Sequence, residues 1–434
     1  MKNPFDPNFG KVPQIYLGRE KIVDNVVQSL EDGTGPYQTS MIYGMRGVGK
    51  TSLLADITSN LAKRDDWIIV YLAMTNDLLE TLIQSIYREA SSKIKQALNK
   101  IDGVKFSAFG FEFEFKVANS QTTYQALLEE MLKVLKKHNQ SLLIAIDEVK
   151  ETPEIVNLAS IYQIMVLKNY PINIMMTGLP KNVSELQNND VLTFLLRSGR
   201  IPLGPLYPFD IKYRYQKAFE RADKEISNST LMKMTKLTKG YAYAFQDLGY
   251  YVWQHSDTQV TEEDVDNVLS LFKHDLFQNA YTKIISELSP TDRLFLLTMA
   301  KSKENVVKIS EIRQQMGKST NYISQYRKRL IDSQVIVEAG YGKVAFSLPF
   351  MGEFILQMAE LYGMDWWNKF KVDYKTSAEI KILVFKFHLW YDLVKKGDFE
   401  WLIKLMRIAL KMPMMNSFAA SLALNEPLSK PWWS

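Results

Sequence analysis

The sequence of 434 residues contains no cysteine and only four histidines. A chain without cysteine has no disulfide framework, no thiolate metal site and no cysteine nucleophile. The histidines, at positions 138, 255, 274 and 388, are too far apart in the chain to suggest a metal cluster. The sequence also lacks a run of about eighteen uncharged apolar residues and an apolar segment at its N-terminus, MKNPFDPNFG. We therefore expect a cytoplasmic protein with no membrane span.

A large excess of one charge is absent as well. The chain has 53 Lys and Arg residues against 48 Asp and Glu residues, which is a formal net charge of +5. Any affinity for nucleic acid must therefore come from a local basic patch and not from the chain as a whole. The length is sufficient for two or three domains with well-formed cores.

The sequence does contain a P-loop motif. Residues 44–51, GMRGVGKT, fit the pattern G-x-x-x-x-G-K-[ST], with an apolar run before them and a helix-like segment after them. The glycines allow backbone N–H groups to surround phosphates at the start of a helix, where the helix dipole favours anions. Lys50 would reach the terminal phosphates, and the Thr51 hydroxyl would hold Mg²⁺. The predicted nucleotide contacts here are Gly44, Arg46, Gly47, Val48, Gly49, Lys50, Thr51 and Ser52.

Two acidic residues follow a second predicted strand. The apolar runs at 67–72 and 142–146 have the composition of buried parallel strands, and the second run ends in Asp147 and Glu148. At the carboxyl end of a strand beside a P-loop, Asp147 would order Mg²⁺ through water and Glu148 would polarise the attacking water. The pattern therefore predicts a site that binds and hydrolyses a nucleoside triphosphate, with Mg²⁺ as cofactor.

The two motifs and their flanks resemble those of AAA+ and STAND ATPases. Residues 16–20, YLGRE, resemble the entry segment [FY]-x-G-R-[ED] of these families. The resemblance implies that the nucleotide is ATP and that Ile15, Leu17 and Gly18 help to cover its adenine. An ordinary helix start is the alternative interpretation of this segment.

The same resemblance implies two further catalytic positions. The apolar run at 171–176 ends in Thr177, which matches the sensor position that contacts the terminal phosphate or the water; a capping threonine is the alternative. Residues 194–206 resemble the segment from which an AAA+ subunit presents an arginine finger to its neighbour. A guanidinium suits that role because it is permanently charged and can bind two phosphate oxygens. We prefer Arg197 to Arg200, and an ordinary surface arginine is the alternative.

Two other segments, residues 207–276 and residues 103–116, have patterns that predict their structure. Residues 207–276 predict a run of helices, which resembles the helical lid of AAA+ proteins. The lid position that usually carries a sensor Arg or Lys falls in residues 240–246, GYAYAFQ, which contain no basic residue. Near residues 103–116, Phe alternates with small or charged residues, which predicts a hairpin insertion with one apolar face. We favour a packed hairpin over a surface that stacks nucleobases.

Residues 277–374 have the order of a winged-helix domain: three predicted helices followed by two strand-like segments. From Lys308 to Lys343 there are seven Lys or Arg residues and three Asp or Glu residues, so this segment carries a charge of 7 − 3 = +4. A recognition helix needs short polar residues for base edges and cations for phosphates, and the third helix offers both. The predicted DNA contacts are Thr320, Asn321, Ser324, Gln325, Arg327, Lys328, Arg329 and Lys343.

The sequence thus predicts an α/β P-loop NTPase core of AAA+ type in residues 1–206, a helical lid in 207–276 and a C-terminal winged helix in 277–374. Residues 375–434 form a tail of alternating aromatic and basic residues, for which helices packed on the winged helix are favoured over an amphipathic helix that binds a membrane or a protein partner. The resemblance, over roughly residues 12–350, is to archaeal-type ATPases related to origin-recognition initiators.

Two functions remain open from the sequence. The first is a slow, regulatory ATPase that assembles into a homo-oligomer when ATP is bound and binds double-stranded DNA through its winged helix. The second is a STAND-like signalling ATPase whose winged helix and tail dock a protein partner or effector. Winged helices serve both purposes, so the fold does not decide between them.

Overall fold

The computed structural model of the chain describes residues 2–8, 14–15, 19–101, 104–107, 110–113, 120–302 and 304–369. Met1–Trp367 form one compact unit by their internal contacts. The predicted tail at 375–434 and the predicted adenine-covering residues Leu17 and Gly18 lie outside the described residues.

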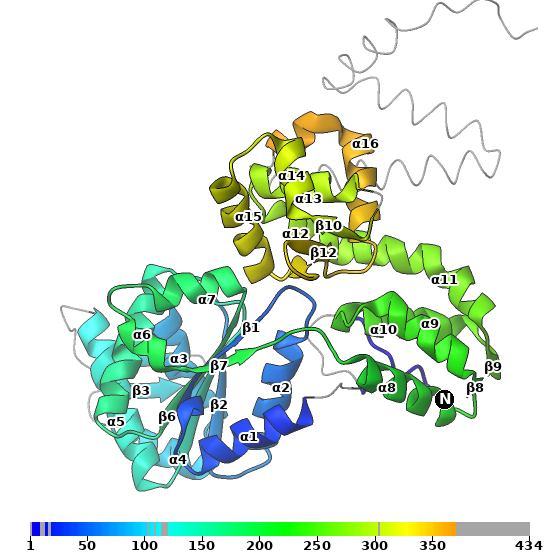
Figure 1. Cartoon of the computed structure of the whole chain (residues 1–434). Coiled ribbons are helices and arrows are strands. Elements are labelled where there is room, and N and C mark those ends of the chain that lie inside the picture. The colour runs from blue at the N-terminus through cyan, green and yellow to red at the C-terminus, as the bar shows by residue number, and fades with distance from the viewer. Residues whose placement is uncertain are drawn as a thin grey trace, which may run out of the picture. The chain divides into compact units, whose positions relative to one another are not determined.

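A five-stranded parallel sheet organises the N-terminal half of the chain (Figure 1). Its strand order is β2-β5-β6-β1-β7, and each neighbouring pair is parallel. The predicted runs at 67–72, 142–146 and 171–176 lie in β2, β5 and β6. The strands are β1 (Thr39–Tyr43), β2 (Trp67–Leu72), β5 (Ser141–Ile146), β6 (Ile172–Gly178) and β7 (Gly199–Pro202).

The sheet separates two hydrophobic cores because alternate residues of a strand face opposite sides. In β1, Ile42 joins the core formed with α1 and α2, whereas its neighbour Met41 joins the core formed with α3 to α7. Leu143 and Leu142 of β5 are divided in the same way. The helices are α1 (Glu20–Glu31), α2 (Lys50–Leu61), α3 (Leu78–Glu89), α4 (Ser92–Leu98), α5 (Ser120–Lys137), α6 (Pro153–Leu167) and α7 (Pro180–Gln187), with the 3-10 turns η1 (Pro36–Gln38) and η2 (Thr193–Arg197).

A short antiparallel hairpin lies between α4 and α5 in the chain. It consists of β3 (Val104–Ser107) and β4 (Gly110–Phe113), which pair with Val104 opposite Phe113. This is the hairpin that the alternation of Phe predicts. It interrupts the connection between β2 and β5 without joining the main sheet.

A bundle of four helices follows the sheet, and we call it the helical bundle. Its buried side chains include an aromatic cluster of Tyr215, Phe219 and Phe245. The helices are α8 (Pro208–Glu220), α9 (Asn228–Thr238), α10 (Ala242–His255) and α11 (Glu262–Asp275), with the small parallel pair β8 (Glu225–Ile226) and β9 (Gln259–Val260).

The N-terminal residues 2–8 lie on this bundle as a strap. The Phe5 side chain is only 2% exposed, and its ring centroid lies 5.6 Å from those of Tyr215 and Phe245. Asn3 donates a hydrogen bond to the backbone oxygen of Tyr250 at 3.1 Å. The sequence analysis did not predict this strap, which brings the start of the chain to residues more than 200 positions away.

The remaining elements form the C-terminal module, residues 276–369. A π-helical turn, η3, continues α11 into the module, and a three-stranded antiparallel sheet has the order β10-β12-β11. Ser289 and Asp292 form a capping box at the start of α13, and Gly317 ends α14 with a φ of 61°. The elements are η3 (Leu276–Tyr281), α12 (Thr282–Ser286), α13 (Pro290–Ala300), β10 (Val306–Lys308), α14 (Ile309–Met316), α15 (Thr320–Asp332), β11 (Ile336–Glu338), β12 (Lys343–Phe346) and α16 (Met351–Lys369).

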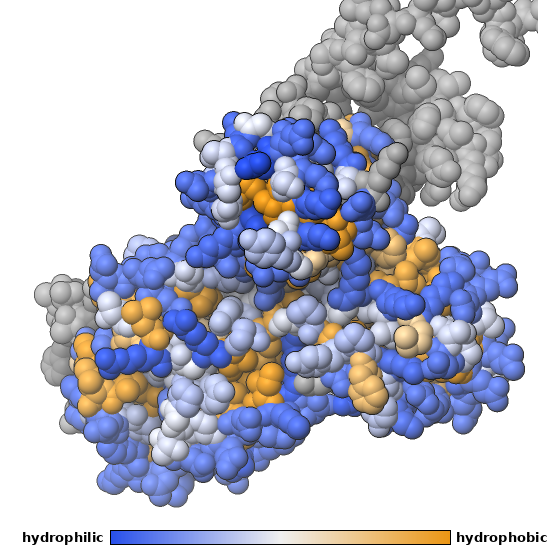
Figure 2. Space-filling model, viewed as in Figure 1, coloured by the Kyte–Doolittle hydropathy of each residue, from blue (hydrophilic) through white to orange (hydrophobic). Residues whose placement is uncertain are grey.

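Figure 2 shows one face of the molecule, on which hydrophilic residues predominate and apolar residues gather in several separate patches. This distribution is the one expected when most large apolar side chains lie in internal cores. In the part of the chain that the structure describes, every helix is too short or too polar to cross a bilayer.

Candidate active site

The P-loop connects β1 to α2, and its backbone conformation depends on glycine. Gly47 and Gly49 have φ angles of 75° and 90°, in the left-handed region that other residues rarely adopt. A Cβ atom on Gly47 would also lie 2.1 Å from the Tyr241 Oη, so a side chain at this position would collide with the helical bundle. The loop therefore presents bare backbone at the N-terminus of α2, which is the arrangement that binds phosphate.

Lys50 is the first residue of α2 and lies against its own loop. Its Nζ donates hydrogen bonds to the backbone oxygens of Gly44 at 3.0 Å and Met45 at 2.9 Å, and the residue is 8% exposed. Burial, followed by the nearby charge of Arg46, lowers the pKa of Lys50 to about 8. The ammonium group thus has only neutral acceptors in its hydrogen bonds, and a phosphate would be a better partner.

The two predicted metal ligands, Thr51 and Asp147, and the predicted catalytic residue Thr177 are joined by hydrogen bonds. The Thr51 hydroxyl donates to Asp147 Oδ2 at 2.8 Å, and the Thr177 hydroxyl donates to Asp147 Oδ1. The Glu148 backbone N–H donates to Thr177 Oγ1 at 3.1 Å, and Glu148 has a φ of 54°. These contacts follow from the strand order, since β5 pairs with β6 and β6 pairs with β1. The sheet therefore brings the residues predicted from three separate motifs to one place.

Arg46, in the middle of the P-loop, binds two carboxylates. Its Nη1 lies 2.9 Å from Glu148 Oε1, and its Nη2 lies 2.8 Å from Glu287 Oε1 in the C-terminal module. Burial disfavours the charge of Arg46, but the hydrogen bonds and negative charges of Glu287 and Glu148 outweigh it and raise the pKa of the guanidinium. The sequence analysis placed Arg46 among the nucleotide contacts and did not anticipate Glu287.

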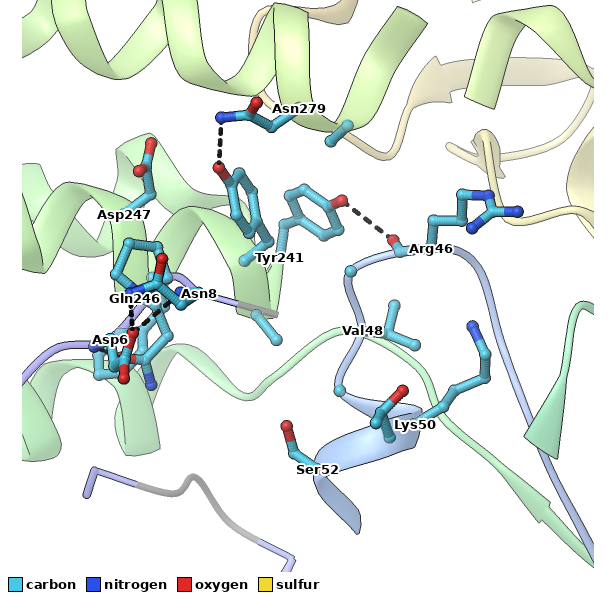
Figure 3. Close-up of a pocket in the computed structure, with 18 of the residues that line it drawn as sticks. Asp6, Asn8, Arg46, Val48, Lys50, Ser52, Tyr241, Gln246, Asp247 and Asn279 are labelled. Atoms are coloured by element: carbon cyan, nitrogen blue, oxygen red, sulfur yellow. Dashed lines mark hydrogen bonds between the residues drawn. The ribbon is translucent and has the colours of Figure 1, made fainter. Parts of the chain in front are cut away.

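The P-loop faces a cavity of about 590 Å³ whose opposite wall is the helical bundle (Figure 3). Tyr241 donates a hydrogen bond from Oη to the backbone oxygen of Arg46 at 3.0 Å, and the Tyr243 N–H donates to the backbone oxygen of Gly47 at 3.0 Å. These two tyrosines belong to residues 240–246, which contain no basic residue. Hydrogen bonds from this segment to the P-loop backbone therefore join the helical bundle to the loop.

The far side of the cavity is formed by the strap and α10. Gln246 donates from Nε2 to the backbone oxygen of Ile15 at 2.9 Å and accepts from the Asp6 N–H at 3.1 Å. Asp247 also lines the cavity and is 1% exposed; burial and the charge of Asp275 raise its pKa to about 8. Gln246 belongs to residues 240–246, which the sequence marks out, but no sequence signal marks Asp6 or Asp247, because their position depends on the docking of the strap.

The two finger candidates lie at the surface. Arg197 ends η2 and Arg200 lies in β7, and both side chains are exposed. Neither is among the described residues that line the cavity. A role for either arginine in hydrolysis would therefore require the site of another chain.

On α15 of the C-terminal module, the predicted DNA contacts divide into two groups. Thr320, Asn321, Ser324, Gln325 and Lys328 are exposed, and Lys343 of β12 is exposed as well, whereas Ile323 and Leu330 are buried.

The other two predicted contacts are bound within the module. Arg327 pairs with Glu338 at 2.6 Å, and Arg329 pairs with Asp292 at 2.5 Å and donates to Ser289 Oγ at 2.7 Å. Asp292 and Ser289 are the capping box of α13, so Arg329 completes the packing of two helices. Sequence periodicity placed both arginines at the flanks of the outward face and did not reveal these partners.

No cluster of three or more His, Asp or Glu side chains suited to a metal ion occurs among the described residues. At the P-loop, the predicted oxygen ligands for a metal are the Thr51 hydroxyl and the Asp147 carboxylate, which are hydrogen-bonded to each other. Mg²⁺ is often held in this way, because it retains several waters and takes its other ligands from substrate phosphates.

A P-loop at the carboxyl end of a parallel sheet, with an acidic pair on the strand two positions away, is the arrangement of an α/β P-loop NTPase. Residues 16–169 match the family model described as an ATPase domain predominantly from Archaea. The P-loop and the acidic pair both lie within this match, so residues 16–169 are an ATPase domain similar to the archaeal type. Residues 278–355 match a second model, described as a domain of unknown function (DUF8462).

Solved structures share this fold at low sequence identity. A Walker-type ATPase of Pyrococcus abyssi is 16% identical, with a TM-score of 0.51, and the match covers 79% of this chain and 96% of that chain. The Aeropyrum pernix ORC2 protein, in ADPNP–ADP complexes, is 13% identical, with a TM-score of 0.57, over 82% of this chain and 97% of that chain. A search of curated proteins finds no match.

Proposed function

We propose that this ATPase is a regulatory switch that binds Mg-ATP between the P-loop and the helical bundle and binds double-stranded DNA through its C-terminal module. In this proposal the bundle is the lid, residues 207–276, and the module is a winged-helix domain, residues 277–374, after a core in residues 1–206. The observation that carries the proposal is the hydrogen-bonded set Thr51, Asp147 and Thr177 at the P-loop, beside a cavity large enough for a nucleotide.

The side chains then have separate roles in hydrolysis. The bare P-loop amides and Lys50 hold the phosphates, and Glu148 polarises the attacking water. Thr177 contacts the terminal phosphate or the water, which is supported by its hydrogen bond to the Glu148 backbone at 3.1 Å. This bond and the bond to Asp147 fix the Thr177 oxygen at the strand end, and the hydroxyl would turn its hydrogen from Asp147 to donate to a phosphate oxygen.

The chemistry of the residues around Thr51 fits Mg²⁺. A hydroxyl and a carboxylate whose oxygens lie 2.8 Å apart are hard oxygen ligands, which suit this ion. Bound Mg²⁺ would neutralise charge on the phosphates and orient them. Thr51 would hold the ion directly and Asp147 would hold its water shell.

ATP would also promote assembly into a homo-oligomer. Arg197 lies at the surface, outside the described lining of its own cavity, which is the position that a finger reaching a neighbouring site requires. A neighbouring chain that supplies Arg197 to the ATP of this chain would couple hydrolysis to assembly.

The proposal of DNA binding rests on the outward face of α15. Short polar side chains and Lys328 are exposed together there, in a segment with a charge of +4. Such a helix can enter a major groove with its polar residues toward base edges and its cations toward phosphates. Arg327 and Arg329 are held in ion pairs within the module. Lys328 and Lys343 are therefore the cations best placed for this contact among the predicted residues.

Duplex binding measured over a series of salt concentrations tests this proposal. We expect affinity to fall as salt rises, because bound cations release counterions from DNA. Lys328→Ala should weaken binding to all sequences and reduce the salt slope by about one, without a change in thermal stability.

Arg329→Ala is the matched comparison for Lys328→Ala. It removes an equal charge from the next residue but leaves the buried Asp292 with its capping-box bonds alone and no ion-pair partner, so we expect a loss of about 1–3 kcal/mol in the free energy of unfolding. Absence of duplex binding at low salt, with intact folding, would reject the DNA-binding role.

A second function, a signalling ATPase in which the C-terminal module regulates and docks a protein partner, has one observation in its favour. Gln334, which follows α15, accepts a hydrogen bond from the Met45 N–H of the P-loop at 3.0 Å. Retained regulation of the ATPase rate by the module without any duplex binding would support this alternative.

A further inference from the structure

The C-terminal module contacts the P-loop at two consecutive residues. Glu287, in the connection between α12 and α13, accepts from Arg46 Nη2 at 2.8 Å and from Arg46 Nε at 3.1 Å. Gln334 accepts from the Met45 N–H at 3.0 Å and donates from Nε2 to the backbone oxygen of Leu203 at 3.2 Å. Glu287, before α13, and Gln334, after α15, thus both hold the P-loop, at Arg46 and Met45.

Arg46 connects Glu287 of the C-terminal module to Glu148, the proposed base. Glu287 occupies the Nε and Nη2 edge of the guanidinium, so Nη1 is the group that remains for the 2.9 Å ion pair with Glu148. A planar guanidinium fixes the directions of its donors, and the position of Glu287 therefore determines which way Nη1 points. The C-terminal module sets the direction of the Arg46–Glu148 pair in this way.

A nucleotide would compete with both carboxylates for Arg46. The guanidinium lies in the loop that surrounds the phosphates, and phosphate oxygens accept two guanidinium hydrogen bonds as carboxylates do. While Glu287 and Glu148 hold Arg46, its donors are directed at carboxylates and the Glu148 side chain is held by the loop. Release of Arg46 would free Glu148 to contact the attacking water.

We propose that Glu287 is a positioning residue that restrains ATP hydrolysis: it holds Arg46 in its ion pair with Glu148 while the C-terminal module is docked on the P-loop. Undocking of the module then frees Arg46 for the phosphates and Glu148 for water. Gln334 lies two residues after the end of α15, so a ligand on α15 is suited to trigger the undocking. The inference rests on the proposed role of Glu148 as the base.

Steady-state kinetics of Glu287→Gln test the restraint. The change keeps the size of the side chain and removes the charge, and we expect kcat to rise about two- to fivefold, the factor by which a partly exposed ion pair shifts an equilibrium. KM should not rise, because the phosphate contacts are retained or strengthened. The conservative variant Glu287→Asp should keep kcat nearer to the parent value.

Glu353→Gln provides the matched control. Glu353 of α16 also joins the C-terminal module to a preceding element, through an ion pair of 2.8 Å with Lys273, but it lies away from the P-loop. We expect it to leave kcat unchanged. A kcat of Glu287→Gln that equals or falls below that of the parent, or an equal rise in both variants, would overturn the inference.

The undocking can be measured without turnover. The chain has no native cysteine, so spin labels at introduced Lys63→Cys and Lys301→Cys report one distance only, between the C-terminal ends of α2 and α13. Glu287→Gln and a non-hydrolysable Mg-ATP analogue should each add a longer distance to the distribution. An unchanged distribution in both cases would contradict undocking.

Failure of this inference is separable from failure of the proposed function. If Glu148→Gln hydrolyses ATP near the parent rate, the assignment of the base is wrong and the restraint has no target. If Glu148→Gln is inactive and Glu287→Gln has the parent kcat, only the restraint is wrong.

Discussion

At the scale of single residues, Lys50 shows how burial prepares the site for phosphate. A lysine whose folded-state pKa is about 8 instead of 10.5 is destabilised in its charged form by its surroundings. The folded chain therefore loses this proton at lower pH than the unfolded chain, so Lys50 makes the free energy of unfolding rise as pH increases from about 8 toward 10.5. Bound phosphate reverses the preference, because it favours the ammonium form.

This linkage predicts that ATP binding takes up protons. Between about pH 7 and pH 9, one unit on either side of the Lys50 pKa, the number of protons taken up per nucleotide should increase, and ATP affinity should fall as pH rises above about 8. Titration calorimetry in buffers of different ionisation enthalpy measures the uptake. Lys50→Arg is the control, since its side chain stays charged over this range. Equal uptake by both proteins would show that another group is responsible.

At the scale of elements, the strap and α10 fit each other through one glycine. A Cβ atom on Gly249 of α10 would lie 2.5 Å from the Phe5 ring, so the strap can dock only where α10 has no side chain. Alanine normally stabilises a helix by about 1 kcal/mol relative to glycine. At this position the methyl group would displace a buried aromatic ring.

We therefore expect Gly249→Ala to destabilise the parent chain and to weaken ATP binding, because the strap lines the cavity. Phe5→Ala should lower the free energy of unfolding by up to about 3–5 kcal/mol. In the Phe5→Ala background the effect of Gly249→Ala on the free energy of unfolding should change sign. There the alanine should stabilise the chain by up to about 1 kcal/mol. Denaturant unfolding of the four proteins measures this cycle. If Gly249→Ala changes the free energy of unfolding in the same direction with and without Phe5, the contact between Phe5 and Gly249 is refuted.

Some elements of the fold could be predicted from the sequence, and others could not. The runs that became β2, β5 and β6 were predictable because strands buried on both faces are continuously apolar, and the P-loop because its glycines and lysine have fixed spacing. The strap was not predictable, since residues 2–8 hold a single large apolar side chain and depend on contacts far along the chain. The four-residue β7 gives too short a pattern for a strand prediction.

The same limit applies to individual cations on a helix. Periodicity predicts Ile323, Tyr326 and Leu330 on the core face of the third helix, and the structure buries Ile323 and Leu330 fully and Tyr326 in part. Periodicity could not show that Arg329 would meet Asp292, because that contact requires the packing of α15 against the start of α13. Likewise, the P-loop motif predicted that Arg46 lies near the nucleotide but contained no information about Glu287, which is 241 positions away.

At the scale of the whole molecule, the proposed finger predicts that hydrolysis depends on association. Specific ATPase activity should increase with protein concentration, because each site would need Arg197 from a neighbour. Arg197→Ala should lower the ATPase rate of the assembled protein by on the order of 10³-fold, as for other arginine fingers, without a loss of ATP binding. Arg200→Ala is the comparison, since Arg200 is the other exposed candidate, and the larger loss of rate identifies the finger. Activity independent of concentration would argue against a site shared between chains.

The account depends most on hydrolysis at the P-loop with Glu148 as the base. Single-turnover hydrolysis of Mg-ATP by Glu148→Gln, measured beside direct ATP binding, tests it. The expected result is ATP bound as tightly as in the parent, with product formation about 10²- to 10⁴-fold slower, while Glu151→Gln, which removes an exposed carboxylate three residues further on, keeps the parent rate. Product formed by Glu148→Gln at the rate of the parent would contradict the central claim.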